Sequence, residues 1–241
     1  MTSPLGLELA GLRLTLPRRA APILDRVSFR LAPGEKAALL GLNGSGKTTL
    51  LLAAAGLLPY EGSVILERSL PGEAPGEAFR RLAGLLFSVP DDQILFPRVL
   101  EDVAFPLIQR GMSRGEAEER SRRVLRVLDA EHLADLAPYR LSHGERLRVA
   151  LAGVMAPDPG LLLLDEPSTS LDPPGKKLLA GFLRETPATV LVATHDLPFV
   201  VGFCTRFIVL DGGRIAEDTS RAEALAFAAH FPRGLSGEAA S

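Results

Sequence analysis

The sequence predicts an α/β fold: a parallel sheet forms the core, an antiparallel β layer precedes it, and a helical subdomain is inserted into it. Three observations predict this arrangement. Hydropathy alternates along the first part of the chain, as in half-buried antiparallel strands. A short apolar strand then runs through a glycine-rich loop into a helix, and two later apolar strands are each followed by a helical pattern. Between these parts, from about residue 90 to 156, the periodicity is that of helices.

The N-terminal layer is expected to contain two strands, Leu7 to Leu16 and Ile23 to Leu31, joined by a turn over Pro17 to Pro22. The first strand of the core is Lys36 to Leu40, a short apolar run that enters the glycine-rich loop. We expect the helix after that loop to extend from about Thr48 to Gly56. These segments together predict a β-loop-α unit that follows a flanking β layer.

Further strands are expected at Ser63 to Leu66 and at Leu85 to Phe87, separated by a mobile loop rich in proline and glycine, Pro71 to Gly76. The remaining core strands are Leu161 to Leu164 and Thr189 to Ala193. Because each is followed by a helical pattern, we expect them to pair in parallel.

In the helical subdomain, Ser113 and Glu116 have the spacing of a capping box, which predicts a helix that begins there and continues through Leu128. Its mixed charges predict a solvated face rather than a binding patch. We expect residues 1–231 to form a single domain with this subdomain inserted, and residues 232–241 to form a flexible tail.

The composition excludes several classes of protein. The chain has 241 residues, of which 46% are hydrophobic and 23% charged, so it can form one globular domain with a sizeable core. Its net charge of -2 argues against a general nucleic-acid binder. A single cysteine, Cys204, excludes an internal disulfide framework and is expected to be a buried apolar side chain. The apolar runs are shorter than the roughly 20 residues that span a membrane, and no signal peptide is recognisable. We therefore expect the chain to serve any membrane through a partner, from the cytoplasmic side.

The glycine-rich loop fits the pattern G-x-x-x-x-G-K-[ST] and lies between a predicted strand and a predicted helix. Its backbone N–H groups and the end of the following helix favour bound phosphates, with Lys47 reaching the β- and γ-phosphates and the Thr48 hydroxyl binding Mg²⁺. The alternative is a glycine-rich turn with an exposed lysine. The predicted nucleotide-binding residues are Gly41, Leu42, Asn43, Gly44, Ser45, Gly46, Lys47, Thr48 and Thr49.

Two carboxylates follow the buried strand Leu161 to Leu164. Asp165 is placed to hold the magnesium shell, and Glu166 to accept a proton from an attacking water. The alternative is that both are solvated ends of the strand. Together with the phosphate loop they predict a P-loop NTPase core, with kinases, GTPases and ATPases all possible at this point.

Three further segments narrow the prediction: Leu141 to Glu145, Ser170 to Asp172 and Thr194 to Asp196. The first looks like the signature sequence of ABC ATPases, and the other two match further motifs of that family in the same order. The resemblance extends from Leu7 to Ile215. Taken alone, Ser142 would be an ordinary helix cap and His195 a polar residue at the end of a strand.

The resemblance to ABC ATPases implies a magnesium-dependent ATP hydrolase that works in pairs, with ATP and Mg²⁺ between the phosphate loop of one subunit and the signature Ser142, His143, Gly144 and Glu145 of the other. Ser142 and the Gly144 amide would then face the γ-phosphate in trans. His195 would contact the phosphate from its own subunit, as a catalytic residue beside Glu166 and Lys47, and Asp172 would line the dimer interface. The implied partners are a second ATPase subunit and integral membrane transporter subunits.

Within the family, Pro90 to Gln93 and Glu101 to Phe105 resemble the ATPases of cobalt- and nickel-type and energy-coupling-factor importers. Such an importer ATPase, for a metal ion or a vitamin, would be peripheral to the cytoplasmic face of the membrane. The alternatives are a soluble ABC ATPase that acts on nucleic acid or ribosomes and a small phosphotransferase, which would have no use for Ser142 to Glu145.

Several positions depart from the family pattern. Ser88 stands where the family has a glutamine that touches Mg²⁺ and links the site to the membrane subunit, and Gln93 could replace it only if this coupling loop bends. His143 replaces a glycine and is expected to constrain the backbone, and Glu145 replaces a glutamine. Leu16 takes the position of the aromatic ring that stacks on adenine, unless Arg13, Arg18 or Arg19 stacks instead.

Overall fold

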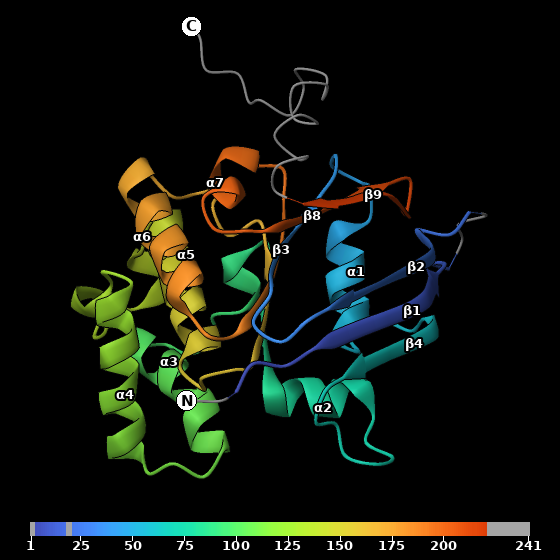
Figure 1. Cartoon of the computed structure of the whole chain (residues 1–241). Helices are drawn as coiled ribbons and strands as arrows, with labels where there is room; N and C mark the ends of the chain where they lie inside the picture. The colour runs from blue at the N-terminus through green and yellow to red at the C-terminus, as the bar shows by residue number, and fades with distance from the viewer. Residues whose placement is uncertain (1–2, 18–20, 221–241) are drawn as a thin grey trace, which may run out of the picture.

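The structure is a computed structural model that describes residues 3–17 and 21–220. Figure 1 shows a central sheet with helices on both sides, an antiparallel layer at one end and a helical lobe at the other. This is the α/β architecture that the sequence predicts. The tail expected over residues 232–241 lies outside the described residues, as does part of the turn between the first two strands.

The antiparallel layer contains β1 (Leu7–Leu14), β2 (Leu24–Leu31) and β4 (Glu61–Leu66), in the order β2-β1-β4. The two predicted N-terminal strands are confirmed, although β1 ends at Leu14 rather than at Leu16. The third strand completes the layer by pairing with the other side of β1.

The central sheet has six strands in the order β5-β6-β7-β3-β8-β9, and the pairs from β5 to β8 are parallel whereas β9 is antiparallel to β8. Residues of β3, β6 and β7 are buried at every position, as expected for parallel strands covered on both faces. The strands are β3 (Lys36–Leu40), β5 (Ala83–Leu86), β6 (Leu161–Asp165), β7 (Thr189–Thr194), β8 (Arg206–Asp211) and β9 (Arg214–Ser220).

Helices connect these strands and form the lobe between β5 and β6. The lobe also contains three short 3₁₀ turns, Pro90–Asp92, Glu131–Leu133 and Pro138–Arg140. The inserted helical subdomain is thus where the sequence places it. The helices are α1 (Lys47–Ala54), α2 (Pro75–Leu82), α3 (Val99–Gln109), α4 (Arg114–Val127), α5 (His143–Met155), α6 (Pro173–Glu185) and α7 (Leu197–Val201).

Helix α2 corrects the expected loop Pro71 to Gly76, because it already begins at Pro75. Proline is well suited to the first turn of a helix, where its missing N–H would have no partner. The predicted capping box is confirmed: Ser113 caps α4, its side chain accepts a hydrogen bond from the Glu116 N–H, and the Glu116 side chain bonds back to Ser113.

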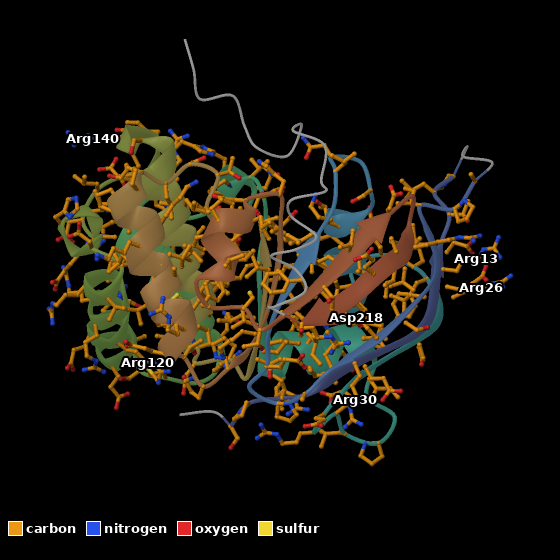
Figure 2. All side chains as sticks on the ribbon, turned by 45° about the horizontal axis from the view of Figure 1, so that its top comes forward. Arg13, Arg26, Arg30, Arg120, Arg140 and Asp218 are labelled. Atoms are coloured by element: carbon orange, nitrogen blue, oxygen red, sulfur yellow. The ribbon has the colours of Figure 1, made fainter. Side chains whose placement is uncertain are left out.

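Charged side chains project from all parts of the described surface (Figure 2). Arg13, Arg26 and Arg30 lie on the antiparallel layer, whereas Arg120 and Arg140 lie on the helical lobe at the other end. Positive charge is therefore distributed over distant elements. No helix in the described ranges is long and apolar enough to cross a membrane.

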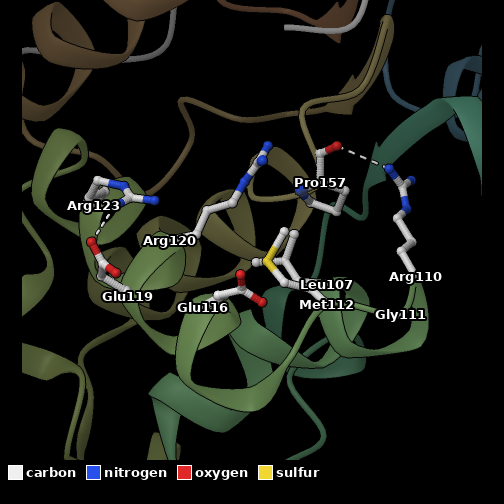
Figure 3. Close-up of a pocket in the computed structure, with 9 residues that line it drawn as sticks. All are labelled: Leu107, Arg110, Gly111, Met112, Glu116, Glu119, Arg120, Arg123 and Pro157. Atoms are coloured by element: carbon white, nitrogen blue, oxygen red, sulfur yellow. Dashed lines mark hydrogen bonds and ion pairs between the residues drawn. The ribbon is translucent and has the colours of Figure 1, made fainter.

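The C-terminal end of α5 is held by two arginines from neighbouring helices (Figure 3). Arg120 of α4 donates to the Ala156 carbonyl at 2.7 Å, and Arg110, at the end of α3, donates to the Pro157 carbonyl at 3.0 Å. Cations at a helix C-terminus satisfy its free carbonyls and complement its dipole. These two hydrogen bonds therefore fix the end of α5, and both arginines also line a cavity of about 500 Å³.

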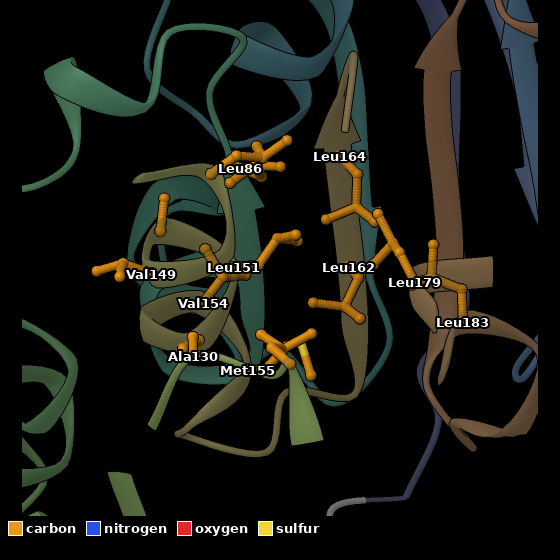
Figure 4. Packing of buried hydrophobic residues seen from close by; sticks show 14 of the residues in the cluster. Leu86, Ala130, Val149, Leu151, Val154, Met155, Leu162, Leu164, Leu179 and Leu183 are labelled. Atoms are coloured by element: carbon orange, nitrogen blue, oxygen red, sulfur yellow. The ribbon is translucent and has the colours of Figure 1, made fainter. Parts of the chain in front are cut away.

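Two hydrophobic cores lie on opposite faces of the central sheet. Alternate leucines of β6 supply both: Leu162 and Leu164 face α5 and α6, and Leu161 and Leu163 face α1 and the antiparallel layer. Figure 4 shows Leu151 of α5 and Leu179 of α6 on either side of Leu162 and Leu164. Because each of these four leucines is at most 2% exposed, a shift of β6 by one residue would exchange its two buried faces.

Candidate nucleotide site

The carboxyl ends of four parallel strands meet at one edge of the central sheet. Leu40 at the end of β3 is paired with Thr194 at the end of β7, and Asp165 of β6 is paired with Ala193. The ends of these strands and the segments that follow them contain the predicted phosphate, magnesium and general-base residues. A crevice beyond the carboxyl ends of parallel strands is the usual place for a ligand in an α/β fold.

The phosphate loop lines a cavity of about 470 Å³ at this edge. Its backbone needs glycine for two different reasons. Gly44 has a φ of 82°, a left-handed conformation that glycine adopts freely. At Gly41, an added Cβ would lie 2.4 Å from the Leu210 carbonyl oxygen. Other lining residues are Leu16, Ile23, Asn43, Gly46, Lys47, Thr48, Thr49, Ser88, Asp165 and Glu166.

Lys47 opens helix α1 directly after the loop, one residue earlier than expected. Its Nζ donates to the carbonyls of Gly41 at 2.8 Å and Leu42 at 3.3 Å, and lies 3.8 Å from Oε1 of Glu166. Burial lowers the pKa of Lys47, and the nearby carboxylates of Glu166 and Asp165 partly offset this effect. A phosphate would supply the charge partner that this buried ammonium needs.

Thr48 and Asp165 form the candidate magnesium site. The Thr48 hydroxyl donates to Oδ2 of Asp165 at 2.7 Å, while Oδ1 is buried without a hydrogen-bond partner in the described structure. Burial raises the pKa of Asp165, chiefly because its charge is desolvated. An unpartnered buried carboxylate oxygen beside a hydroxyl fits a hard cation such as Mg²⁺. No cluster of three or more ligating side chains occurs in the described ranges, so phosphate oxygens and water would complete the shell.

Glu166 follows Asp165 with its backbone in the left-handed region, at a φ of 48°. This conformation is uncommon for a residue other than glycine and marks a constrained position. Oε2 accepts a hydrogen bond from the Thr194 hydroxyl at 2.9 Å, and Oε1 lies 3.0 Å from Nδ1 of His195. The carboxylate is therefore fixed in orientation at the edge of the cavity, as a general base must be.

Asp196, which follows His195, links the carboxyl end of β7 to the segment that follows β6. Asp196 accepts hydrogen bonds from Ser168 at 3.0 Å and Lys176 at 2.6 Å, and caps α7 through the Phe199 N–H. The roles of Thr194, Ser168 and Lys176 were not among the sequence predictions. Thr194 could have been found, because the last residue of a parallel strand lies beside the residue that ends its neighbour.

The signature residues lie at the start of α5 rather than at the phosphate loop. Ser142 caps the helix and Glu145 closes a capping box with it. Among the residues that line the described cavity, none belongs to the stretch Ser142 to Glu145. The structure thus separates the signature from the phosphate loop of the same chain.

His143 was expected to constrain the backbone of the signature, but Gly144 is the position with the least space around it. His143 is the first residue of α5 and is not among the described residues with a positive φ, so the constraint expected there is absent. Gly144 is the tighter position, because an added Cβ would lie 2.8 Å from the Ser170 carbonyl oxygen. Asp172 caps α6 by accepting from the Gly175 N–H at 3.0 Å, and lies 3.9 Å from Arg148 of α5. The signature therefore rests on the Ser170–Asp172 segment of its own chain.

Ser88 and Gln93 separate in the structure. Ser88 lines the cavity next to Asp165, whereas Gln93 is bonded to the end of β5: it accepts from the Phe87 N–H at 3.2 Å and donates to the Leu85 carbonyl at 3.0 Å. Gln93 lines a different hollow, which it shares with Phe105. The loop bend that would let Gln93 replace the missing glutamine is not present.

Leu16, the residue expected to cover adenine, lines the cavity at the end near Ile23. It is 38% exposed, and neither Tyr60 nor Tyr139 lines the cavity. Of the arginines considered for stacking, Arg18 and Arg19 lie outside the described residues. The described wall at this end of the cavity is thus aliphatic.

Comparisons with known proteins agree with this geometry. Residues 24–169 match the family model described as ABC transporter. A Streptomyces avermitilis protein, provisionally named an ABC transporter ATP-binding protein, is 41% identical over 221 residues, covering 91% of this chain and 84% of that protein. A Gloeobacter violaceus protein with the same provisional description is 44% identical over 198 residues, covering 81% of each.

Solved structures share the fold. CbiO1 from Clostridium perfringens, described as part of the ABC transporter complex cbiONQ, has a TM-score of 0.78 and 30% identity over 91% of this chain and 90% of its own. The ATP-binding cassette MJ0796, a dimer in a post-hydrolysis state bound to ADP and Pi, has a TM-score of 0.78 and 28% identity over 89% of this chain and 98% of its own.

The chain belongs to the ABC transporter family and is an ABC-type ATP-binding domain. As a domain of this type it is an ATP hydrolase. The resemblance stated from the motifs is confirmed.

We expect Lys47→Ala to abolish measurable ATP binding, because it removes the buried cation placed to offset the phosphate charge. Titration with a fluorescent ATP analogue measures this directly. Lys36→Ala is a suitable control, since Lys36 is also buried but bonds the Thr186 carbonyl away from the cavity. ATP affinity of Lys47→Ala equal to that of the wild type would refute the assignment of the phosphate loop.

We expect Leu16→Tyr to tighten ATP binding by about 5- to 160-fold, since base–aromatic stacking contributes about 1–3 kcal/mol. In the wild type the aliphatic wall covers the base without a flat ring, so ATP and GTP should bind with similar affinity. Dissociation constants for both nucleotides test this. Strong ATP preference in the wild type, or no gain with tyrosine, would mean that other groups hold the base.

Proposed function

We propose that this chain is the ATP-hydrolysing subunit of an ABC importer, that it pairs head to tail around two ATP molecules, and that it drives integral membrane subunits from the cytoplasmic face of the membrane. The proposal rests on a site whose residues lie in two separate places on the chain's surface. Phosphate, magnesium and general-base residues share one cavity, whereas the signature lies outside it. Such a site is completed by a second subunit, and the dimeric state of MJ0796 supports this arrangement.

Each group in the chain has a role in this scheme. Lys47 and the loop N–H groups would bind the phosphates, and Thr48 and Asp165 would hold Mg²⁺, which would neutralise charge on the phosphate oxygens. Glu166 accepts a proton from the attacking water while Thr194 and His195 hold its carboxylate in place. Ser142 and the Gly144 amide of the second subunit face the γ-phosphate, with Asp172 at the interface.

A hollow of about 670 Å³ between the core and the lobe supports a membrane partner. It is lined by Gln93 and by Phe105, whose ring is 40% exposed on α3. An exposed aromatic residue in a hollow near the loop after β5 fits a protruding segment of another protein. The likeness to CbiO1, part of a transporter complex, favours a metal-ion or vitamin importer. The net charge of -2 and the dispersed arginines favour a role without nucleic acid.

We expect the chain to co-purify with a polytopic membrane protein when it is tagged and extracted in mild detergent from its own organism. Mass spectrometry identifies the partner. The matched control is Phe105→Asp, which should lose the partner because it places a charge in the hollow, yet bind ATP normally. Recovery of ribosomal proteins or nucleic acid, with no membrane protein, would refute the importer proposal.

We expect Glu166→Gln to bind ATP but to hydrolyse it about 10²–10⁴-fold more slowly, since it lacks the base. The uncleaved ATP should then hold two chains together. Gel filtration should show a dimer with ATP and a monomer with ADP. A Glu166→Gln chain that binds ATP but stays monomeric would contradict pairing of identical subunits.

A further inference from the structure

The N-terminus of helix α5 already holds an anion, the carboxylate of Glu145. A single oxygen, Oε2, accepts hydrogen bonds from both the N–H and the hydroxyl of Ser142, each at 2.7 Å. The Ser142 Oγ in turn accepts from the Glu145 N–H at 3.3 Å. Both donors of Ser142 are thus directed at one side chain of its own helix.

A serine hydroxyl has one proton and can donate only one hydrogen bond. If Ser142 donates to a phosphate, it cannot donate to Glu145 at the same time. A phosphate oxygen and the Glu145 oxygen that both lie within hydrogen-bonding distance of this hydroxyl are also close to each other, at most roughly 5.5 Å apart. At that separation, two anions in an exposed site repel each other measurably.

The helix itself has little freedom to relieve this conflict. Its C-terminal end is held by Arg110 and Arg120, and at its start Gly144 lies against the Ser170 carbonyl with no space for a Cβ. The movable group is the Glu145 side chain, which is only partly buried. The bonds from Ser142 lower the pKa of Glu145, so the carboxylate is charged at neutral pH.

We propose that Glu145 is a positioning residue that competes in cis with the γ-phosphate of the partner subunit's ATP for the Ser142 donors, and so limits the stability of the ATP-bound dimer. This inference rests on the proposed function. Each closing event must break the hydrogen bond from the Ser142 hydroxyl to Glu145 and bring a phosphate up to a carboxylate. The family pattern has an uncharged glutamine here, which could cap the helix without this repulsion.

The test distinguishes the effect of the negative charge of Glu145 from its effect as a helix cap. In a Glu166→Gln background, Glu145→Gln keeps an oxygen that can accept from Ser142 and removes the charge, so it should lower the ATP-dependent dimer dissociation constant by about tenfold or more. The gain should shrink as salt is raised, because the charges are exposed. ATP affinity of the monomer should stay unchanged, since Glu145 does not line the phosphate-loop cavity.

The chain offers a matched control in the second capping box, Ser113 with Glu116 at the start of α4. Glu116→Gln makes the same chemical change at the same helical position but away from the signature. It should leave the dimer dissociation constant unaltered, and thermal unfolding should show that both variants fold. A purely structural role for Glu145 predicts no difference between the two variants.

The outcomes are distinguishable by analytical ultracentrifugation. If Glu166→Gln dimerises with ATP and Glu145→Gln does not strengthen the dimer, the competition is refuted while the proposed function stands. An equal gain from Glu116→Gln would also refute it, because the effect would then be one of general charge. If no variant dimerises with ATP, the paired mechanism fails and this inference fails with it.

Discussion

The parallel register of β6, β7 and β3 is the constraint on which the site depends. It brings Asp165, Thr194 and the start of the phosphate loop to the same edge, so that Thr48 and Asp165 come within hydrogen-bonding distance. The leucines of β6 fill the cores on both faces of the sheet, so Asp165 at the end of the run is the residue of β6 that distinguishes this register from a slipped one. A one-residue slip would bury Asp165 in a hydrophobic core and remove it from the phosphate loop. The polar residue that ends the apolar strand thus marks both the register and the site.

Helix α5 connects the parts of the molecule that a head-to-tail pair would use. Ser142 lies at its start, and Arg146 in its first turns forms an ion pair with Asp91 at 2.9 Å in the turn after β5. Arg148 lies within 3.9 Å of Asp172 and 3.6 Å of Asp129. These exposed pairs contribute little stability individually. Together they connect the signature, the turn Pro90–Asp92 and the segment before α6 to the same helix.

The sequence was most informative where a local pattern has one structural solution. The phosphate loop, the Asp165–Glu166 pair and the capping box at Ser113 could all be predicted, because strand, turn and helix signals are contiguous there. The ion pair of Lys176 with Asp196 could not, since it depends on how α6 lies beside the residue that follows β7, and the role of Thr194 could be found only by assuming that β6 and β7 are neighbours. The hairpin of β8 and β9 was also missed, and β9 owes its place to pairing with β8. Non-local pairing leaves no fixed spacing in a sequence.

The two capping boxes show that the residues that cap a helix can also be the residues that bind a phosphate. An acid in the first turn stabilises a helix by accepting free N–H groups and complementing the dipole, typically by 0.3–1 kcal/mol. The same N–H groups and dipole are what make a helix N-terminus bind phosphate. At α4 the two roles never meet, because Glu116 faces solvent on the lobe. At α5 they do meet, because Ser142 is both the cap and the signature serine. The charge that makes Glu145 a stronger cap in the single chain therefore makes the start of α5 a weaker binding site for the γ-phosphate of a second subunit's ATP.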